Sequence, residues 1–558
     1  MLEHSTTVRF CRWLFSWRGL RRILILLAWL VTLVALFHGE ETWRGRRAWN
    51  QYRRELEAQG AQLDFAALVP KPVPDEQNFA ATPVIKSWFE KATPTEPEEK
   101  WNDNYSRLAA RVRAPTKAKD AKAERRFEDL VAWERAFATL RPGEATGQQQ
   151  VDAAEPAPSP VPGIPPPPLV PPSEQQFYST NLDAASRAKA APAVLEGLKS
   201  NEALLTELRA ASQRPYSRYP VNYDVETPFA ILLPHFKMLR GVSERLRLKT
   251  CAELAGGQSD QAMEDLKLMF RLADSVKEEP FLISHLVRIA CGQVATQPIW
   301  EGLAEHRWSD AQLQELETRL QQYNFIADLK TPVTAERAAS IATIELVRKK
   351  GLGYLNALGS PEGTPAAADA KLANFIGFVL VPRGWYDQEE LNYCRGFNIQ
   401  LATALDTAKK RVSPTRVKAD AEAFYQMMCP TGLAGTGFGR IFHHRIIASL
   451  LLPALGKVVM RAAAAQTAFN QAAIACALER YRLANGHFPE TLGALAPRFI
   501  SALPNDVLTG EPYKYRLTDD GRFVLYSVGW DEKDDGGVSG KSLFDDKQGD
   551  CVWEYPMK

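Results

Sequence analysis

A fifteen-residue apolar run near the start constrains this chain more than any other feature. The run Ile23–Phe37 reads ILILLAWLVTLVALF and holds no charged side chain. With the flanking residues it approaches the roughly 20 residues that span a bilayer. No small-residue cleavage site follows it, so we predict an uncleaved transmembrane anchor over 23–39, with a cleaved signal peptide as the alternative.

Arginines lie on both sides of the run, so charge alone gives little orientation. Five precede it (9, 12, 18, 21 and 22) and five follow it (44, 46, 47, 53 and 54). A short basic head before a first apolar segment is typical of an export signal. We therefore predict that residues 1–22 are cytoplasmic and that the body lies in the periplasm, as in a single-pass protein of the inner membrane.

The composition is that of an ordinary globular protein with several domains. The 558 residues are 45% hydrophobic and 24% charged, with a formal charge of +2, which gives no reason to expect a nucleic-acid partner. None of the seven cysteines forms a C-x-x-C pair, which excludes metal-ribbon and thioredoxin-type motifs. A structural disulfide stays open.

Changes in composition divide the chain after the anchor into further segments. We predict an extended and helical stalk over 40–150, a proline-rich spacer over 151–175, a helical body over 176–350, a linker over 351–372, a helical region over 373–442 and a C-terminal module over 443–558. Ten of the seventeen residues Pro156–Pro172 are proline, which favours polyproline II. Alternating charge over 100–140 predicts a solvated helix.

Helical spacing dominates the body. It predicts a helix over 193–211 that starts after Pro192, another over 233–254, one opened by Ser259 and one opened by Pro280. The stretch Arg247–Val276 resembles one tetratricopeptide helix pair. Without a sustained period, a helical-hairpin array and a plain helical bundle remain equal alternatives. The fold class predicted is mainly α.

The C-terminal module changes from helix to strand. An Ala-rich helix over 461–483 should end at Asn485-Gly486, and a short helix should follow over 490–496. The segments 513–517 and 523–528 alternate as strands do and are joined at Asp519-Asp520-Gly521, which predicts a hairpin.

This ending resembles the major pseudopilin family of type II secretion. The resemblance is carried by ALERYRLANGHFPETLGAL, LPNDVLTGEPYKYR, FVLYSVGWDEKDDGG and GDCVW, at 477–495, 503–516, 523–537 and 549–553. It implies a small α+β domain and an association with secretion machinery. No prepilin leader precedes Ile446, so we expect no processing into a pilus. The whole chain also resembles membrane-anchored bacterial proteins that carry this ending.

Calcium binding is implied by the same resemblance. Asp531 and Asp550 match acidic positions of the family's calcium loop, and Asp534 and Asp535 are further candidates. Clustered carboxylates and loop carbonyls supply the six to eight oxygens that Ca²⁺ prefers. A solvated acidic turn is the alternative.

No catalytic motif is complete in this sequence. The segment 536–542, GGVSGKS, lacks the first glycine of a phosphate loop. We therefore expect a non-enzymatic envelope protein that binds other envelope proteins. The alternative is an envelope hydrolase with a site in the helical body. It would require His235, His285, His443 or His444 to converge with acidic side chains.

Overall fold

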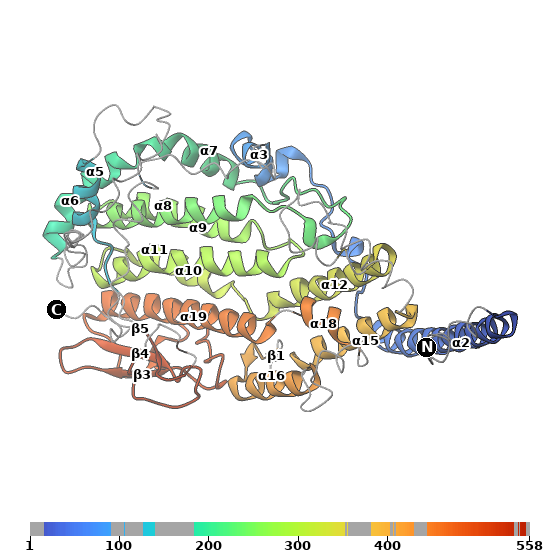
Figure 1. The fold of residues 1–558 in the computed structure, drawn as a ribbon. Helices are drawn as coiled ribbons and strands as arrows, with labels where there is room; N and C mark the ends of the chain where they lie inside the picture. Colours follow the sequence, from blue (N-terminus) through green and yellow to red (C-terminus); the bar gives the residue numbers. More distant parts are fainter. Residues whose placement is uncertain are drawn as a thin grey trace, which may run out of the picture.

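The molecule is mainly helical, as predicted, with two small sheets in its described part (Figure 1). The computed structural model describes residues 16–90, 105, 126–139, 183–351, 354, 381–401, 405–406, 409–428, 444–452, 454–540, 545 and 547–553.

The α-helices are α2 (Trp17–Ala58), α3 (Pro83–Glu90), α5 (Leu130–Ala138), α6 (Ala184–Gly197), α7 (Glu202–Ser212), α8 (His235–Ala255), α9 (Ser259–Asp274), α10 (Leu282–Ala304), α11 (Asp310–Gln321), α12 (Lys330–Lys350), α15 (Arg383–Ile399), α16 (Pro414–Met428), α18 (Ile446–Leu451) and α19 (Leu455–Asn485). The 3-10 turns are η2 (Ala66–Leu68), η3 (Asp75–Gln77), η4 (Phe79–Ala81), η7 (Lys199–Asn201), η8 (Pro228–Ala230), η9 (Ala327–Leu329) and η11 (Leu492–Leu495). The strands are β1 (Leu405–Asp406), β2 (Arg411–Val412), β3 (Lys514–Leu517), β4 (Phe523–Ser527) and β5 (Cys551–Trp553).

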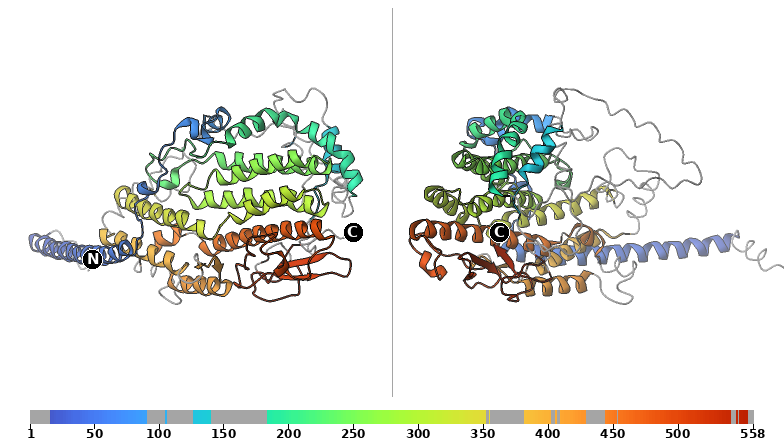
Figure 2. Two further views of the ribbon diagram at one scale, coloured as in Figure 1. Left: turned by 180° about the vertical axis from the view of Figure 1, so that it is seen from behind. Right: turned by 90° about the vertical axis from the view of Figure 1, so that its left-hand side faces the viewer.

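Helix α2 is one unbroken helix that joins the apolar run to the body. The Ser16 hydroxyl accepts a hydrogen bond from the Gly19 amide at 3.1 Å and caps its start, and Gly60, with φ +80°, follows its end. Its first half is long and apolar enough to cross a membrane, and its large side chains are exposed. This half projects away from the body, toward the viewer of Figure 1 (Figure 2, right).

The body is a stack of helices that run side by side. Helix α8 packs on α9 and α10, and α19 packs on α10 and α11 (Figure 1). Gly257, with φ +75°, allows the tight turn between α8 and α9. A capping box of Ser309 and Gln312 starts α11. Together, α18 and α19 are also long and apolar enough to cross a membrane. Most residues of α19, however, are buried, as in a core helix.

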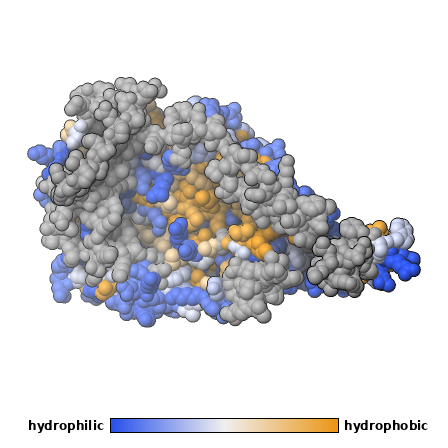
Figure 3. Space-filling model, viewed as in Figure 1, coloured by the Kyte–Doolittle hydropathy of each residue, from blue (hydrophilic) through white to orange (hydrophobic). Residues whose placement is uncertain are grey.

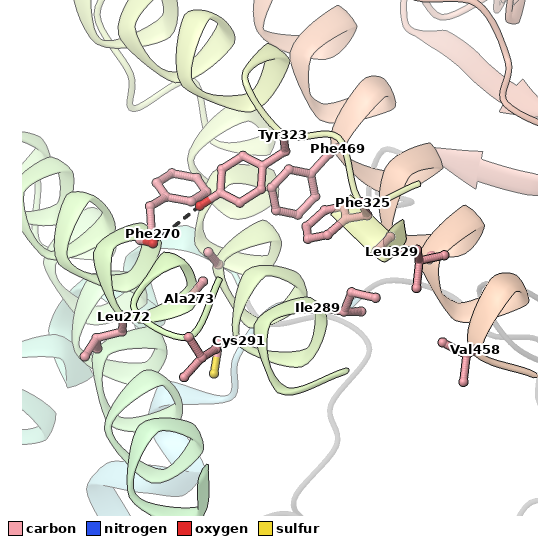
Figure 4. Close-up of a cluster of buried hydrophobic side chains, with 14 of the residues drawn as sticks. Phe270, Leu272, Ala273, Ile289, Cys291, Tyr323, Phe325, Leu329, Val458 and Phe469 are labelled. Atoms are coloured by element: carbon pink, nitrogen blue, oxygen red, sulfur yellow. Dashed lines mark hydrogen bonds between the residues drawn. The ribbon is translucent and has the colours of Figure 1, made fainter. Parts of the chain in front are cut away.

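Aromatic rings fill the place where α19 meets the body (Figure 4). The ring of Phe469 on α19 lies 4.8 Å from Tyr323 and 5.0 Å from Phe325, measured between centroids. The Tyr323 hydroxyl donates to the Phe270 carbonyl at 3.4 Å. One hydrophobic core therefore includes both the segment predicted as the helical body and the start of the C-terminal module.

Two helix predictions are wrong in their detail. The helix expected to begin after Pro192 begins at Ala184, where the Asp183 carboxylate accepts from the Ser186 amide, so that Pro192 lies inside α6. Of the stretch 100–140 expected to be a solvated helix, the structure describes residues 105 and 126–139. These residues bury Leu130 and Trp133 in α5, since tertiary packing against α6 and α8 outweighs the alternating charge around them.

The C-terminal hairpin forms as predicted. Strands β3 and β4 are antiparallel, with Leu517 opposite Phe523, and α19 ends at Gly486 with φ +85°. Strand β5, which pairs with β4, was not predicted, because its three residues are too few to show alternation. The short helix expected over 490–496 is the 3-10 turn η11.

Several predictions fall outside the described residues. They are the head up to residue 15, much of the stalk between 91 and 150, the proline-rich spacer, most of the linker, residues 373–380 and 429–442 of the helical region, and His443. The cysteines described are buried free thiols: Cys251, Cys291, Cys394, Cys476 and Cys551. No disulfide joins any pair of these five.

Candidate functional site

The most specific feature of the described structure is the junction where α2 enters the body along α15. A Cβ atom on Gly45 would lie 2.1 Å from the Gly384 carbonyl oxygen, and one on Gly384 would lie 2.2 Å from the Glu41 carbonyl oxygen. Both positions therefore require glycine for the two helix backbones to touch. This contact fixes the angle at which the apolar half of α2 leaves the body.

A buried carboxylate holds the same junction together. Glu41 is 6% exposed and accepts hydrogen bonds from Arg44 Nη2 at 2.5 Å and from Trp385 Nε1 at 2.9 Å. His444 Nε2 lies 4.0 Å from the carboxylate. Burial alone would raise the pKa of Glu41, but the hydrogen bonds from Arg44 and Trp385 outweigh it and hold the pKa below its ordinary value. The charge is therefore kept at neutral pH.

Packing continues from this junction into the main core. Phe37, at the end of the apolar run, lies edge-on to Trp385 with the ring centroids 6.4 Å apart. Trp49 and Leu56 are buried in the core, and the Tyr52 hydroxyl accepts from Asn398 Nδ2 at 3.0 Å. The second half of α2 is thus a structural part of the body, which differs from the predicted stalk.

Helix α15 carries three acidic side chains with different partners. Asp387 pairs with Arg348 at 3.3 Å, whereas Glu389 accepts from the Ile446 and Ala448 amides at 2.8 and 2.9 Å and so caps α18. Glu390 is 1% exposed, and its Oε1 has no hydrogen-bond partner among the described residues. Burial raises the pKa of Glu389 to about 7 and that of Glu390 to about 8.

Among the three histidines considered for hydrolysis that the structure describes, His235 makes the shortest contact with an acidic group. His235 Nε2 lies 2.8 Å from Glu279 Oε1, and Ser284 Oγ donates to Glu279 Oε2 at 2.6 Å. The carboxylate sits between imidazole and hydroxyl, whereas a nucleophilic serine needs the imidazole in the middle. His235 is fully buried and stacks on Tyr219 at 4.2 Å. This cluster therefore stabilises the core by joining α8 to the start of α10 through buried hydrogen bonds.

The other histidines have separate surroundings. Burial and, to a smaller extent, the charge of nearby Arg288 lower the pKa of His285 to about 4. His444 belongs to the anchor junction, and His443 lies outside the described residues. Sequence reasoning missed His306, whose Nδ1 lies 2.8 Å from Glu479 Oε1, because the two residues are far apart in the chain.

The four predicted calcium ligands lie in one loop, and the carboxylates of three of them accept hydrogen bonds from different groups of that loop and of β4. Asp550 is 2% exposed and accepts from the Gly537 amide at 2.6 Å and from the Asp535 amide at 3.3 Å. Asp534 accepts from the Gly536 amide and the Tyr526 hydroxyl, and Asp531 accepts from the Lys533 amide.

These contacts do not assemble a metal site by themselves. Within the described part of the chain, no three His, Cys, Asp or Glu side chains are grouped to hold a metal ion. Residues 541–544 and 546 of the same loop lie outside that part, so calcium binding stays a prediction.

A cavity of about 460 Å³ lies where η8, α10, α12 and α19 meet. Its walls are mostly aliphatic and aromatic, and three charged side chains also line it: Glu336, Lys457 and Arg461. Burial raises the pKa of Glu336 to about 7. No hydrogen bond or ion pair engages its carboxylate among the described residues.

No protein-family model, curated protein or solved structure matches this chain in the comparisons made. The junction was also missed from the sequence. The only sequence feature that could have indicated it was the position of Glu41 among arginines at the end of an apolar run. No feature of the nearby sequence points to Gly384 or Trp385 as its partners.

Proposed function

We propose that this chain is a non-enzymatic, single-pass membrane protein of the bacterial envelope whose body binds other envelope proteins. The observation that carries the proposal is the exposed apolar half of α2, which continues without a break into a half fixed to α15 by Gly45, Gly384 and Glu41. A helix built into the body in this way suits a permanent anchor better than a removable signal peptide.

The compartment follows from the basic head and the anchor. With residues 1–22 in the cytoplasm, the anchor over 23–39 would cross the inner membrane and leave the body in the periplasm. The pseudopilin-like module would then lie on the side where type II secretion machinery works. Its docking to such machinery is part of the proposal and rests on the sequence resemblance.

A topology experiment tests the anchor and its orientation. Cys11 and Cys429 are first changed to serine, and the exposed Ser501 is changed to cysteine as a reporter. A membrane-impermeant maleimide should label this cysteine in intact spheroplasts. Labelling only after the membrane is opened, or recovery of the full-length chain in the soluble fraction, would refute the proposed location.

The junction is tested separately by a matched pair of glycine variants on α2. Gly45→Val should force α2 from α15, because even a Cβ atom would meet backbone there, whereas Gly39→Val places its side chain in open space. Spin labels at Arg54 and Ser501 should give one narrow distance distribution in the native protein and in Gly39→Val. They should give a broad one in Gly45→Val, and an unchanged distribution there would contradict the fixed junction.

Calcium is tested by thermal unfolding with and without the ion. If the loop binds Ca²⁺, saturating ion raises the melting temperature by linkage, and the pair Asp531→Ala with Asp550→Ala removes the rise. Because Asp550 also bonds two loop amides, its loss lowers stability without ion as well. A rise that survives both substitutions would exclude this loop as the site.

A hydrolytic site, the alternative function, would need an accessible acid–base pair. The buried His235–Glu279 pair is closed to substrate, and Glu479 beside His306 is also bound by Arg482. Burial would raise the pKa of Glu479, but hydrogen bonds from Arg482 and His306 hold it below its ordinary value. That carboxylate is a weak base at neutral pH, so we advance no second function.

A further inference from the structure

The cavity opens on the side of the body toward which the anchor projects. In the right-hand view of Figure 2, α2 extends from the face that Figure 1 presents to the viewer. Figure 3 shows hydrophobic side chains gathered in a hollow in the middle of this face. Three helices that line the cavity, α10, α12 and α19, lie in the same part of Figure 1.

The walls and mouth of the cavity suit a hydrocarbon chain. Ile231, Phe281, Leu282 and Val458 are buried side chains of its wall, and a volume of about 460 Å³ lies within the range of roughly 300–1,000 Å³ typical of small-molecule sites. Apolar side chains also remain in water around it: Phe229 is 44% exposed, Leu232 55% and Ile283 52%. Exposed apolar side chains clustered at a cavity mouth mark a binding site more often than a plain surface.

The charges at the cavity suit an anionic head. Lys457 and Arg461 lie one turn apart on α19, and neither forms an ion pair among the described residues. Across from them, α12 contributes Glu336. Burial raises the pKa of this carboxyl to about 7, so at neutral pH a large fraction is protonated and can donate a hydrogen bond.

We propose that this cavity binds a single-chain anionic lipid drawn from the bilayer, with its chain between α10 and α12 and its head at Lys457 and Arg461. The supply of lipid from the bilayer rests on the anchored orientation proposed above. A folded protein segment would need a longer groove, whereas one hydrocarbon chain fits a cavity of this size. The bilayer below the open face is also the nearest source of such chains.

Direct binding to the purified full-length protein in detergent tests the site without reference to topology. The probe is a fatty acid that carries a fluorescent group on its chain, together with the matched fatty alcohol. The native protein should bind the acid more tightly than the alcohol. Ile283→Asp should weaken binding of both probes at least tenfold, because it places a charge at the apolar mouth.

Matched variants separate the site from general effects. Leu483→Asp alters a side chain of similar exposure at the other end of α19 and should leave binding unchanged. The pair Lys457→Glu with Arg461→Glu should weaken the acid at least fivefold and the alcohol less than twofold. Lys418→Glu, an exposed cation on α16, is the control for charge.

Photo-crosslinking covers the case in which a variant fails to fold. A fatty acid with a diazirine on its chain, bound to the native protein, should label peptides that contain Leu286 or Ala339 of the cavity wall. Labels elsewhere, equal binding by Ile283→Asp, or saturable binding of an apolar peptide but not of the probes would overturn the proposal. None of these results depends on where the body lies in the cell.

Discussion

Two groups of buried acidic side chains lie at opposite ends of this helical body and differ in whether they form ion pairs. At the end far from the anchor, Arg187 is 1% exposed and pairs with both Glu301 and Glu305, and Arg247 pairs with Glu128. Near the anchor, Glu390 on α15 is equally buried but forms no ion pair among the described residues. Glu389 beside it accepts hydrogen bonds from the Ile446 and Ala448 amides.

The difference lies in whether a buried carboxylate has an ion-pair partner, because burial raises the pKa in both groups. Burial raises the pKa of Glu301 as well, but Arg187 opposes the rise. Near the anchor, burial dominates and raises the pKa of Glu390 to about 8, with Arg348 opposing it only in part. The far group is a set of ion pairs that link α6 to the C-terminal end of α10, and α8 to the residues just before α5. The near group can take up protons close to neutral pH, in the helix that holds the anchor.

Removal of the central cation should have the largest effect. Arg187→Met leaves Glu301 and Glu305 without their buried partner, and breaking such a pair typically costs about 3–5 kcal/mol. We expect a loss of this size in the free energy of unfolding, measured in denaturant at pH 7.5. A loss below about 1 kcal/mol would show that the ion pairs at the far end contribute little to stability, so that the two ends would not differ in this respect.

An exposed ion pair gives the scale for comparison. Lys199 and Glu196 are 3.1 Å apart with 72% and 71% of their side chains exposed. Lys199→Met should change stability by less than about 0.5 kcal/mol, since solvent screens such pairs.

A pH-dependent effect should follow at Glu390. Between its ordinary pKa of 4.5 and its folded pKa of about 8, the folded state holds a proton that the unfolded chain has released. Its contribution to stability is therefore complete below about pH 4.5 and is lost as pH rises toward 8. Glu390→Gln removes this dependence. It should match the native protein near pH 5 and exceed it by on the order of 2 kcal/mol at pH 8.5.

Unfolding curves of both proteins across this pH range check the sign. The pKa of Glu253 on α8, raised to about 7 by burial and by Asp265, adds a similar trend to both proteins, so the difference between them isolates Glu390. A constant difference at all pH values would mean that Glu390 does not titrate there.

Local patterns in the sequence predicted the parts of this fold that local physics controls. The anchor helix, the helix end at Gly486 and the hairpin of β3 and β4 each depend on residues close together in the chain. The junction depends on contacts between residues far apart in the chain, such as Trp385 and Glu41, which are separated by 344 positions. No sequence periodicity predicts such a pairing. Glu390 likewise reads as an ordinary helical surface residue until its burial is known.

The candidate sites divide in the same way. The acidic loop was found because Asp531, Asp534, Asp535 and Asp550 belong to a pattern that can be read along the chain. The cavity is assembled from η8, α10, α12 and α19, so its walls read as separate apolar stripes. Sequence analysis of a single chain finds such stripes without showing that they leave a space between them.

Among the buried groups, the smallest effect should come from Glu389, which separates the loss of a helix cap from the loss of a buried charge. At pH 5, well below its folded pKa of about 7 and close to its ordinary value of 4.5, Glu389 is neutral in the folded protein and ionisation of the unfolded chain contributes little, so a change to glutamine leaves the charge balance nearly unaltered. The new amide nitrogen cannot accept from the Ile446 or Ala448 amide, so Glu389→Gln should cost about 0.5–1 kcal/mol, as loss of a helix cap does. Glu390→Gln at the same pH should cost nothing, because no helix amide donates to it. Equal changes in the free energy of unfolding for the two substitutions would show that the amide contacts of Glu389 do not stabilise α18.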